Sequence, residues 1–278
     1  MQNAGIASLG LNWRYLAFDV HPDSLRATID GAKAMKFIGL NLTVPHKVLA
    51  LDMVDELDES ARSWGAVNTI RFEARDTGGT WLSLVHFADT TPAEIRAKGF
   101  NTDADAIVRA LREDLDLDSL AGKSVLLLGA GGAGRVAALK LASEGVRSLF
   151  LVNRTAKTAE KLAAEIRRRF PRPEIILGYP KEKVDLVINA TSLGLQAGDP
   201  LPFDEIQFAL PRASAVYDMI YRPAETPLLE VAGAAGCRAA NGLGMLLHQG
   251  AQALEIWSGT TPPIQIMRNA LEQEVYRR

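Results

Sequence analysis

The chain contains a single cysteine among its 278 residues, which excludes a framework of disulfides within one chain. That residue, Cys237, lies in the segment AAGCRAA, where no His or second Cys stands at a metal-ligand spacing. We therefore predict no metal site there. Such sparing use of thiols is typical of a reducing compartment, and we expect a cytoplasmic location.

Two further absences narrow the class of protein. The formal net charge is only −2, so no excess of basic residues favours nucleic acid or an anionic membrane surface. No apolar run reaches the length that spans a membrane, and the first residues lack the charged-then-apolar pattern of a signal peptide. With 47% hydrophobic and 23% charged residues, the composition is that of a soluble globular protein. We expect a small-molecule partner, with no nucleic acid and no membrane.

The most informative segment is 125–142, which reads VLLLGAGGAGRVAALKLA. Four apolar residues suited to a buried parallel strand lead into glycines and then into an alanine-rich helical pattern. This order matches G-x-G-x-x-G, in which backbone N–H groups and the positive end of the helix bind a pyrophosphate. The predicted dinucleotide site consists of Gly129, Ala130, Gly131, Gly132, Ala133 and Gly134. The alternative is an ordinary tight turn between a strand and a helix.

Three of these glycines have distinct expected roles. Gly129 allows the tight turn, Gly131 the close approach of the pyrophosphate, and Gly134 the close packing of the helix on the strand.

The residues after the next predicted strand indicate which dinucleotide is bound. Enzymes that use NAD usually carry Asp or Glu about twenty residues past the glycines, where it binds the ribose hydroxyls. Here that position reads Asn153-Arg154-Thr155 and offers no carboxylate. The planar guanidinium of Arg154 suits a 2′-phosphate, so we expect NADP rather than NAD. The alternative is a loop in which Thr155 caps the next helix.

The order of the predicted elements indicates an α/β protein of two domains. In the first part we expect strands at 13–20, 37–44, 66–72 and 81–87, and helices at 22–35, 46–57 and 102–115. Because strands alternate with helices there, we expect a parallel sheet. Residues 73–99 are predicted to form an excursion on the surface, a hairpin followed by a loop.

The second part is predicted to be Rossmann-like. We expect strands at 125–128, 149–152, 186–189 and 215–218, and helices at 133–143, 156–170, after Thr226 and at 245–257. The predicted domains are an α/β substrate domain (1–103), an NADP-binding Rossmann domain (104–242), and C-terminal helices (243–278) that pack back on the substrate domain.

Three short polar clusters lie where predicted strands end, at the sheet edge where α/β proteins bind ligands. They read NLTVPHK (41–47), GAVNT (65–69) and NTD (101–103). Their one Lys, one Asp and several neutral hydrogen-bonding groups suit a polyhydroxylated small molecule. Lys47 beside Asp103 would be a paired base and acid. Taken singly, each cluster could be a helix cap or a turn.

In this order the clusters resemble the shikimate dehydrogenase family. The likeness continues through GAGGAG (129–134), NRT (153–155), NATSLG (189–194), YDMIY (217–221) and NGLGMLLHQGA (241–251). The resemblance implies reversible, NADPH-dependent reduction of 3-dehydroshikimate to shikimate in aromatic amino-acid biosynthesis, by a monomer or a homodimer. Quinate/shikimate dehydrogenase is the rival within the family, and an NADP-binding paralogue with little or no activity is the further alternative.

The resemblance also implies roles for individual residues. Lys47 would be the catalytic acid/base at the reacting oxygen, with Asp103 as its partner. Substrate would be bound by Thr43, Asn68, Asp103, Tyr221 and Gln249. The adenosine phosphate would be bound by Asn153, Arg154 and Thr155, and Met219 and Gly242 would line the nicotinamide pocket.

The chain departs from the family pattern at two places. The family begins with a strand and a Ser-x-Ser-Pro turn whose serines bind the substrate carboxylate, whereas Met1-Gln2-Asn3-Ala4 aligns with the middle of that motif. We therefore expect a start at an internal methionine or a truncated product, which would bind NADP but use shikimate poorly. The segment 73–99 is also longer than the family's hairpin, and Ala104 stands where the family usually has glycine.

Overall fold

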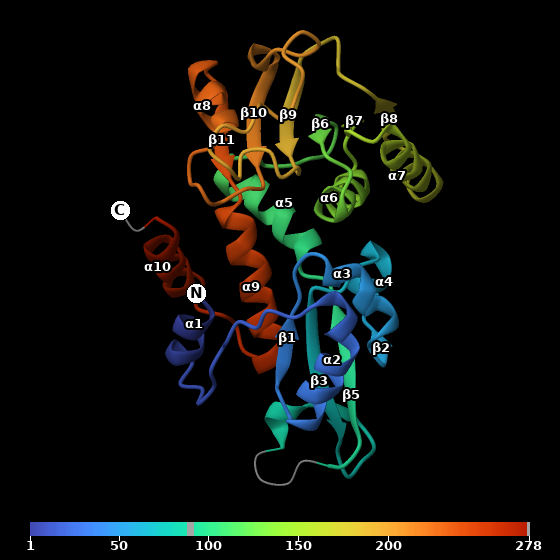
Figure 1. The fold of residues 1–278 in the computed structure, drawn as a ribbon, viewed down its shortest axis with the longest axis vertical. Coiled ribbons are helices and arrows are strands. Elements are labelled where there is room, and N and C mark those ends of the chain that lie inside the picture. Colours follow the sequence, from blue (N-terminus) through green and yellow to red (C-terminus); the bar gives the residue numbers. More distant parts are fainter. Residues whose placement is uncertain (88–91, 277–278) are drawn as a thin grey trace. The chain divides into compact units, whose positions relative to one another are not determined.

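In the computed structural model, which describes residues 1–87 and 92–276, the chain builds two sheets, one in each of two units (Figure 1). Unit 1 comprises Met1–Asp103 and Gln249–Leu271, and unit 2 comprises Ala104–His248 and the residues from Glu272 onward. This architecture confirms the predicted α/β class with two domains. None of the described helices has both the length and the apolar character needed to cross a membrane.

The five-stranded sheet of unit 1 is mixed. Its strands are β1 (Gly39–Asn41), β2 (Glu56–Leu57), β3 (Thr69–Arg75), β4 (Trp81–Ser83) and β5 (Ile95–Phe100). They follow the order β1-β3-β5-β2, and β4 pairs with β3. Strand β3 is antiparallel to β1, β4 and β5, and only β2 runs parallel to its neighbour. The predicted parallel sheet is therefore wrong here, because β3 returns through β4 and β5 without the crossover helix that parallel neighbours need.

Among the described residues, unit 1 contains seven helical segments before residue 103. They are α1 (Gln2–Ser8), η1 (Pro22–Ser24), α2 (Leu25–Ala34), α3 (His46–Leu49), η2 (Ala50–Asp52), α4 (Glu59–Trp64) and η3 (Leu84–His86). Helix α2 buries Leu25, Ile29 and Ala32, which follow one another at helical spacing, in one apolar cluster of unit 1. The same cluster contains Ile70 and Phe72 of β3, both fully buried.

Three predictions for unit 1 are corrected by the structure. Residues 13–20 form no strand, because their alternating pattern has no hydrogen-bonded neighbouring strand among the described residues; Leu16 and Phe18 are 65% and 62% exposed. The predicted helix 46–57 ends at Asp52, and its last residues form β2 instead. The predicted strand 81–87 ends at Ser83 and continues as a 3₁₀ turn.

The segment 73–99 is also only partly as expected. The hairpin is present as β3 and β4, but the segment is no surface excursion, because β5 lies between β3 and β2 in the sheet. Glu73 is 1% exposed and receives charged hydrogen bonds from Arg71 and Arg96, which satisfy a carboxylate that the sequence pattern placed at the surface. Residues 88–91 of the predicted loop lie outside the described part of the chain.

Unit 2 contains a six-stranded parallel sheet with the order β11-β10-β9-β6-β7-β8. Its strands are β6 (Ser124–Leu128), β7 (Ser148–Val152), β8 (Glu174–Leu177), β9 (Val184–Asn189), β10 (Ala213–Asp218) and β11 (Arg238–Asn241). Numbered from β6, this is the doubly wound order 3-2-1-4-5-6 of dinucleotide-binding domains. Ligands of such sheets bind outside the carboxyl ends of the two central strands, here β6 and β9.

The remaining helices alternate with these strands or follow them. They are α5 (Asp103–Asp114), α6 (Gly132–Ser143), α7 (Ala156–Arg169), the 3₁₀ turn η4 (Leu210–Arg212), α8 (Pro227–Ala234), α9 (Leu243–Ser258) and α10 (Ile264–Val275). Within unit 1, the indole of Trp257 at the end of α9 donates to the carbonyl of Ile70, and Gln2 donates to the carbonyl of Gly250. These bonds fix the end of α9 against β3 and α1.

Candidate active site

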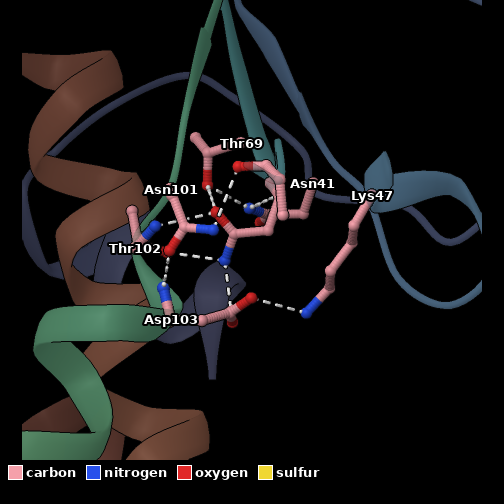
Figure 2. Close-up of polar contacts among 8 residues, drawn as sticks. Asn41, Lys47, Thr69, Asn101, Thr102 and Asp103 are labelled. Atoms are coloured by element: carbon pink, nitrogen blue, oxygen red, sulfur yellow. Dashed lines mark hydrogen bonds and ion pairs between the residues drawn. The ribbon is translucent and has the colours of Figure 1, made fainter. Parts of the chain in front are cut away.

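Lys47 and Asp103 form an ion pair at the polar end of the unit 1 sheet (Figure 2). The Nζ of Lys47 lies 2.8 Å from Oδ2 of Asp103. Lys47 lies in α3, which begins just after β1 and the turn that follows it, and Asp103 is the first residue of α5, three residues after β5. The Asp103 side chain is 9% exposed, whereas that of Lys47 is 27% exposed. The pair thus combines a buried carboxylate with an ammonium group that a substrate can reach.

Asn68 holds the carboxylate of this pair. Its Nδ2 donates to Oδ1 of Asp103 and to Oγ1 of Thr102, both at 2.9 Å. Its Oδ1 accepts from the Thr102 N–H at 2.8 Å and from the Thr69 hydroxyl at 3.2 Å. All four hydrogen-bonding positions of the amide are therefore in use. Direct binding of substrate by Asn68 stays a prediction, and it would require the exchange of one of these bonds.

Further polar residues of the predicted clusters support the same pair. Asn101 donates through Nδ2 to the carbonyl of Ala66 and accepts from the N–H of Asp103, which fixes the start of α5. Asn41 donates to Oγ1 of Thr69 at 3.0 Å. Sequence reasoning placed Asn41 and Thr69 inside motifs without giving them a role.

Tyr15 also reaches this network and was missed by the sequence. Its hydroxyl donates to Oδ1 of Asn41 at 3.0 Å, and Asn3 holds its backbone through two hydrogen bonds. Burial raises the pKa of Tyr15, which keeps its hydroxyl a donor. The sequence analysis gave Tyr15 no role, because it placed residues 13–20 in a strand and Tyr15 belongs to none of the polar clusters.

The other predicted substrate ligands are distributed over both units. Thr43 is exposed in the turn before α3, where its carbonyl accepts from the N–H of His46. Gln249 is half-buried on α9 and belongs to unit 1, whereas Tyr221 follows β10 in unit 2 and is 37% exposed. Their contact with substrate stays a prediction.

The glycine turn of unit 2 contains two positions at which the fold leaves no room for a side chain. Gly129 has φ +101°, and a Cβ there would lie 2.8 Å from the carbonyl oxygen of Ala190. A Cβ on Gly134 would lie 2.2 Å from the carbonyl oxygen of Gly129. These contacts agree with the tight turn and the close helix packing expected for the two positions.

Gly131 and Gly132 are different, because a Cβ at either position would meet no protein atom within 4 Å. They stand at the start of α6, where Gly131 is the N-cap and no side chain caps the helix. The first N–H groups of a helix have no partner within it, and the two glycines leave space beside them. The residues present therefore fit the pyrophosphate of a dinucleotide, whose phosphates would take the place of the missing side chains.

Asn153 connects this turn to the loop after β7. Its Oδ1 accepts from the N–H of Ala130 at 2.9 Å, and its Nδ2 donates to the carbonyl of Thr155 at 3.0 Å. These bonds orient the loop, and the prediction that Asn153 also binds the adenosine phosphate is not tested by them. Arg154 and Thr155 are exposed immediately before α7, and Thr155 makes no side-chain cap bond. A guanidinium beside an uncapped helix start fits a phosphate group.

Met219 and Gly242 lie against each other in unit 2. The N–H of Gly242 donates to the carbonyl of Ile220, and a Cβ on Gly242 would lie 2.1 Å from the carbonyl oxygen of Met219. Any larger residue at 242 would push these backbones apart. The structure thus joins the two residues that were predicted to line the nicotinamide pocket.

Asp218, just before Met219, organises the same region and was missed by the sequence. It is fully buried; its Oδ1 accepts from Asn189 Nδ2 and from the N–H of Ile220, and its Oδ2 accepts from the hydroxyl of Thr226 at 2.7 Å. Burial raises the pKa of Asp218, although these hydrogen bonds oppose the shift. The carboxyl group therefore joins the ends of β9 and β10 to the start of α8.

Among the residues that the structure describes, no group of three or more His, Cys, Asp or Glu side chains could hold a metal ion.

Comparison with known proteins gives the same assignment throughout the chain. Family models match at residues 1–70 (shikimate dehydrogenase substrate binding domain), 112–194 (shikimate / quinate 5-dehydrogenase) and 242–272 (shikimate 5′-dehydrogenase C-terminal domain). A shikimate dehydrogenase (NADP(+)) of Desulforamulus reducens is 38% identical over 283 residues, which cover 99% of this chain and 90% of that protein.

Solved structures agree with this result. A crystal structure of shikimate dehydrogenase in complex with NADP+ has 34% identity and a TM-score of 0.82, over 98% of this chain and 89% of that one. A ligand-free 5-ketofructose reductase of Gluconobacter sp. has 35% identity and a TM-score of 0.78, over 98% and 92%. On this identity and coverage, the chain belongs to the shikimate dehydrogenase family.

Proposed function

We propose that this protein is an NADP-dependent shikimate dehydrogenase, which reversibly reduces 3-dehydroshikimate to shikimate. The observation that carries the proposal is the Lys47–Asp103 pair, in which a partly exposed ammonium group is held at 2.8 Å by a buried carboxylate. The membership of the family supplies the substrate class, and the geometry supplies a group able to act on it.

Lys47 performs the proton transfer in this proposal. NADPH, when bound, supplies a hydride to the ketone carbon of the substrate, and negative charge then develops on the ketone oxygen. The ammonium group of Lys47 stabilises that charge and donates its proton to the oxygen. In the oxidative direction the neutral amine accepts the proton of the substrate hydroxyl. Asp103 keeps the Lys47 side chain directed into the site through the Oδ2 hydrogen bond.

The cofactor is held by unit 2 in this proposal. The start of α6 at Gly131 and Gly132 takes the pyrophosphate, because both positions leave room and the helix supplies N–H donors. Arg154, exposed before α7, takes the 2′-phosphate of NADP. Support for NADP comes also from the NADP(+)-dependent relatives.

A second candidate is the reduction of a neutral polyhydroxylated ketone, which the 35% identity to a 5-ketofructose reductase favours. Lys47 is the one lysine or arginine in the three polar clusters, and it is already paired with Asp103. A substrate without a carboxylate would need no further cation there. Quinate, which carries a carboxylate like shikimate, is the rival substrate within the family.

A steady-state comparison tests these candidates. Initial rates are measured with shikimate and quinate, each with NADP and NAD, and with 5-ketofructose and NADPH. We expect shikimate with NADP to exceed every other pair in kcat/KM by at least about tenfold, which corresponds to roughly 1.4 kcal/mol. A higher kcat/KM for 5-ketofructose or quinate would mean that this compound, and not shikimate, is the substrate. An absence of turnover with all three would overturn the proposal.

We also propose a cytoplasmic location and a monomer or homodimer. The single cysteine supports the first statement, because cytosolic thiols stay reduced. Cell fractionation and sedimentation of the purified protein would test the two statements separately.

A further inference from the structure

We propose that Asn41 and Thr69 are positioning residues for the acid/base pair. They orient the amide of Asn68. This amide donates a hydrogen bond to the Asp103 carboxylate, which also accepts from Lys47. The inference depends on the proposed function only in the roles of Lys47 and Asp103. Figure 2 shows the continuous set of hydrogen bonds that connects these side chains.

The orientation of the Asn68 amide is fixed by a backbone donor. The N–H of Thr102 can only donate, and it lies 2.8 Å from Oδ1 of Asn68. The oxygen of the amide must therefore face Thr102 N–H, so its NH₂ group faces Asp103 at 2.9 Å. A reversed amide would place its oxygen against the carboxylate, which is unfavourable for two acceptors.

The orientation of the Asn41 amide is fixed by a backbone acceptor. The carbonyl of Asn68 can only accept, and Nδ2 of Asn41 donates to it at 3.2 Å and to Oγ1 of Thr69 at 3.0 Å. Oδ1 of Asn41 then faces the Tyr15 hydroxyl, which must donate to it.

Thr69 transmits this orientation from one amide to the other. Its hydroxyl carries one proton, and its oxygen already accepts from Asn41. The proton is therefore directed to Oδ1 of Asn68 at 3.2 Å. Thr69 is fully buried and Asn68 is 1% exposed, so water cannot replace either bond without entering the core. Asn41 thus donates to Thr69, Thr69 to Asn68, and Asn68 to Asp103. Both oxygens of Asp103 accept a hydrogen bond, one from Asn68 and one from Lys47.

The decisive variant is Thr69→Val, which preserves shape and removes the hydroxyl. Asn68 Oδ1 then keeps a single donor, and Asn41 Nδ2 keeps only a backbone acceptor. The matched variant Thr69→Ser keeps the hydroxyl and should restore the orientation. Ser83→Ala removes another buried hydroxyl of the same sheet, which bonds only to the carbonyl of Trp257 in the described contacts, and reports the cost for stability alone.

Three quantities are measured for each variant: kcat and KM for substrate, the pH profile of kcat/KM, and NADP affinity. We expect Thr69→Val to lower kcat about tenfold, the effect of losing the buried hydrogen bond that orients Asn68. We also expect Thr69→Val to change the pH profile of kcat/KM on its acidic side. The affinity for NADP should stay unchanged. Thr69→Ser should stay within about twofold of the unchanged protein, as should Ser83→Ala.

Hydrogen exchange of the Asn68 side-chain NH₂ group, followed by NMR, tests the same inference without catalysis. Exchange should be faster in Thr69→Val than in Thr69→Ser. If Thr69→Val and Thr69→Ser share one kcat, one pH profile and one exchange rate, the positioning role is refuted. If the unchanged protein turns over no substrate while exchange responds as expected, the proposed function fails and the positioning of Asn68 stands.

Discussion

Two glycines of the turn before α6 should respond in opposite ways to the same substitution. A Cβ at Gly134 would lie 2.2 Å from the carbonyl oxygen of Gly129, whereas a Cβ at Gly131 would meet nothing within 4 Å. Gly134→Ala should therefore damage the fold of unit 2. Gly131→Ala should leave the fold intact and remove the space that the pyrophosphate needs.

The magnitudes follow from this geometry. Forcing an extra carbon into a packed position costs about 1–3 kcal/mol or more, and the helix preference of Ala returns about 1 kcal/mol. Because the opposing atom at Gly134 is backbone, we take a net loss of about 2 kcal/mol, which lowers the Tm by roughly 4–8 °C. Gly131 has φ −71°, which any residue adopts, so the Tm of Gly131→Ala should change by less than about 2 °C.

Calorimetry of the cofactor-free proteins and titration with NADP separate the two effects. Gly131→Ala should weaken NADP binding by at least about tenfold, or roughly 1.4 kcal/mol, at an unchanged Tm. Equally tight NADP binding by Gly131→Ala would refute the placement of the pyrophosphate at this glycine. An unchanged Tm of Gly134→Ala would refute the close approach of α6 to the turn.

Two other variants probe the cofactor loop and the pH dependence of stability. Arg154→Ala should raise the Kd of NADP about tenfold to a hundredfold and leave that of NAD unchanged, because it removes a charge-assisted bond to the 2′-phosphate; equal weakening of both in calorimetric titration would contradict this. Burial alone would raise the pKa of Asp55, but hydrogen bonds from Lys33 and from the N–H of Ala97 lower it below its ordinary 3.8. Asp55 therefore stabilises the fold above pH 3.8, and this contribution is lost as the pH falls through the lowered pKa. Asp55→Asn should thus have a lower urea midpoint at neutral pH, and the difference should close in acid; a difference independent of pH would refute the argument.

The sequence predicted unit 2 more accurately than unit 1 because of how its strands are buried. All residues of β6 are buried, so the run SVLLL carries a clear signal for a central parallel strand. The edge strands β8 and β11 were missed, since they are four residues long and half exposed and show no continuous apolar run. In unit 1 the alternating pattern of residues 13–20 was typical of a strand, but a strand also needs a partner, which a local pattern cannot supply.

The candidate site, too, could be predicted from the sequence only in part. Lys47 and Asp103 could be paired in advance, because each follows a strand end within a recognisable polar cluster. The supporting bonds could not, because a neutral amide or hydroxyl has many possible partners and the sequence does not indicate which of them it meets. Asp218 meets Asn189, 29 positions away, and in the sequence it stands as one acid in an apolar strand. Which end of the Asn41 amide donates and which accepts depends on the backbone carbonyl of Asn68, and no side-chain pattern reveals such a contact.

The central claim is that Lys47 transfers the proton in an NADP-dependent reaction of shikimate, and the turnover of Lys47→Ala tests it most directly. NADPH formation from shikimate is followed for the unchanged protein and for the variant, with NADP affinity measured in parallel. We predict that kcat falls by about 10²–10⁴-fold in the variant while the Kd of NADP stays the same. Turnover of shikimate by Lys47→Ala at the rate of the unchanged protein would contradict the account.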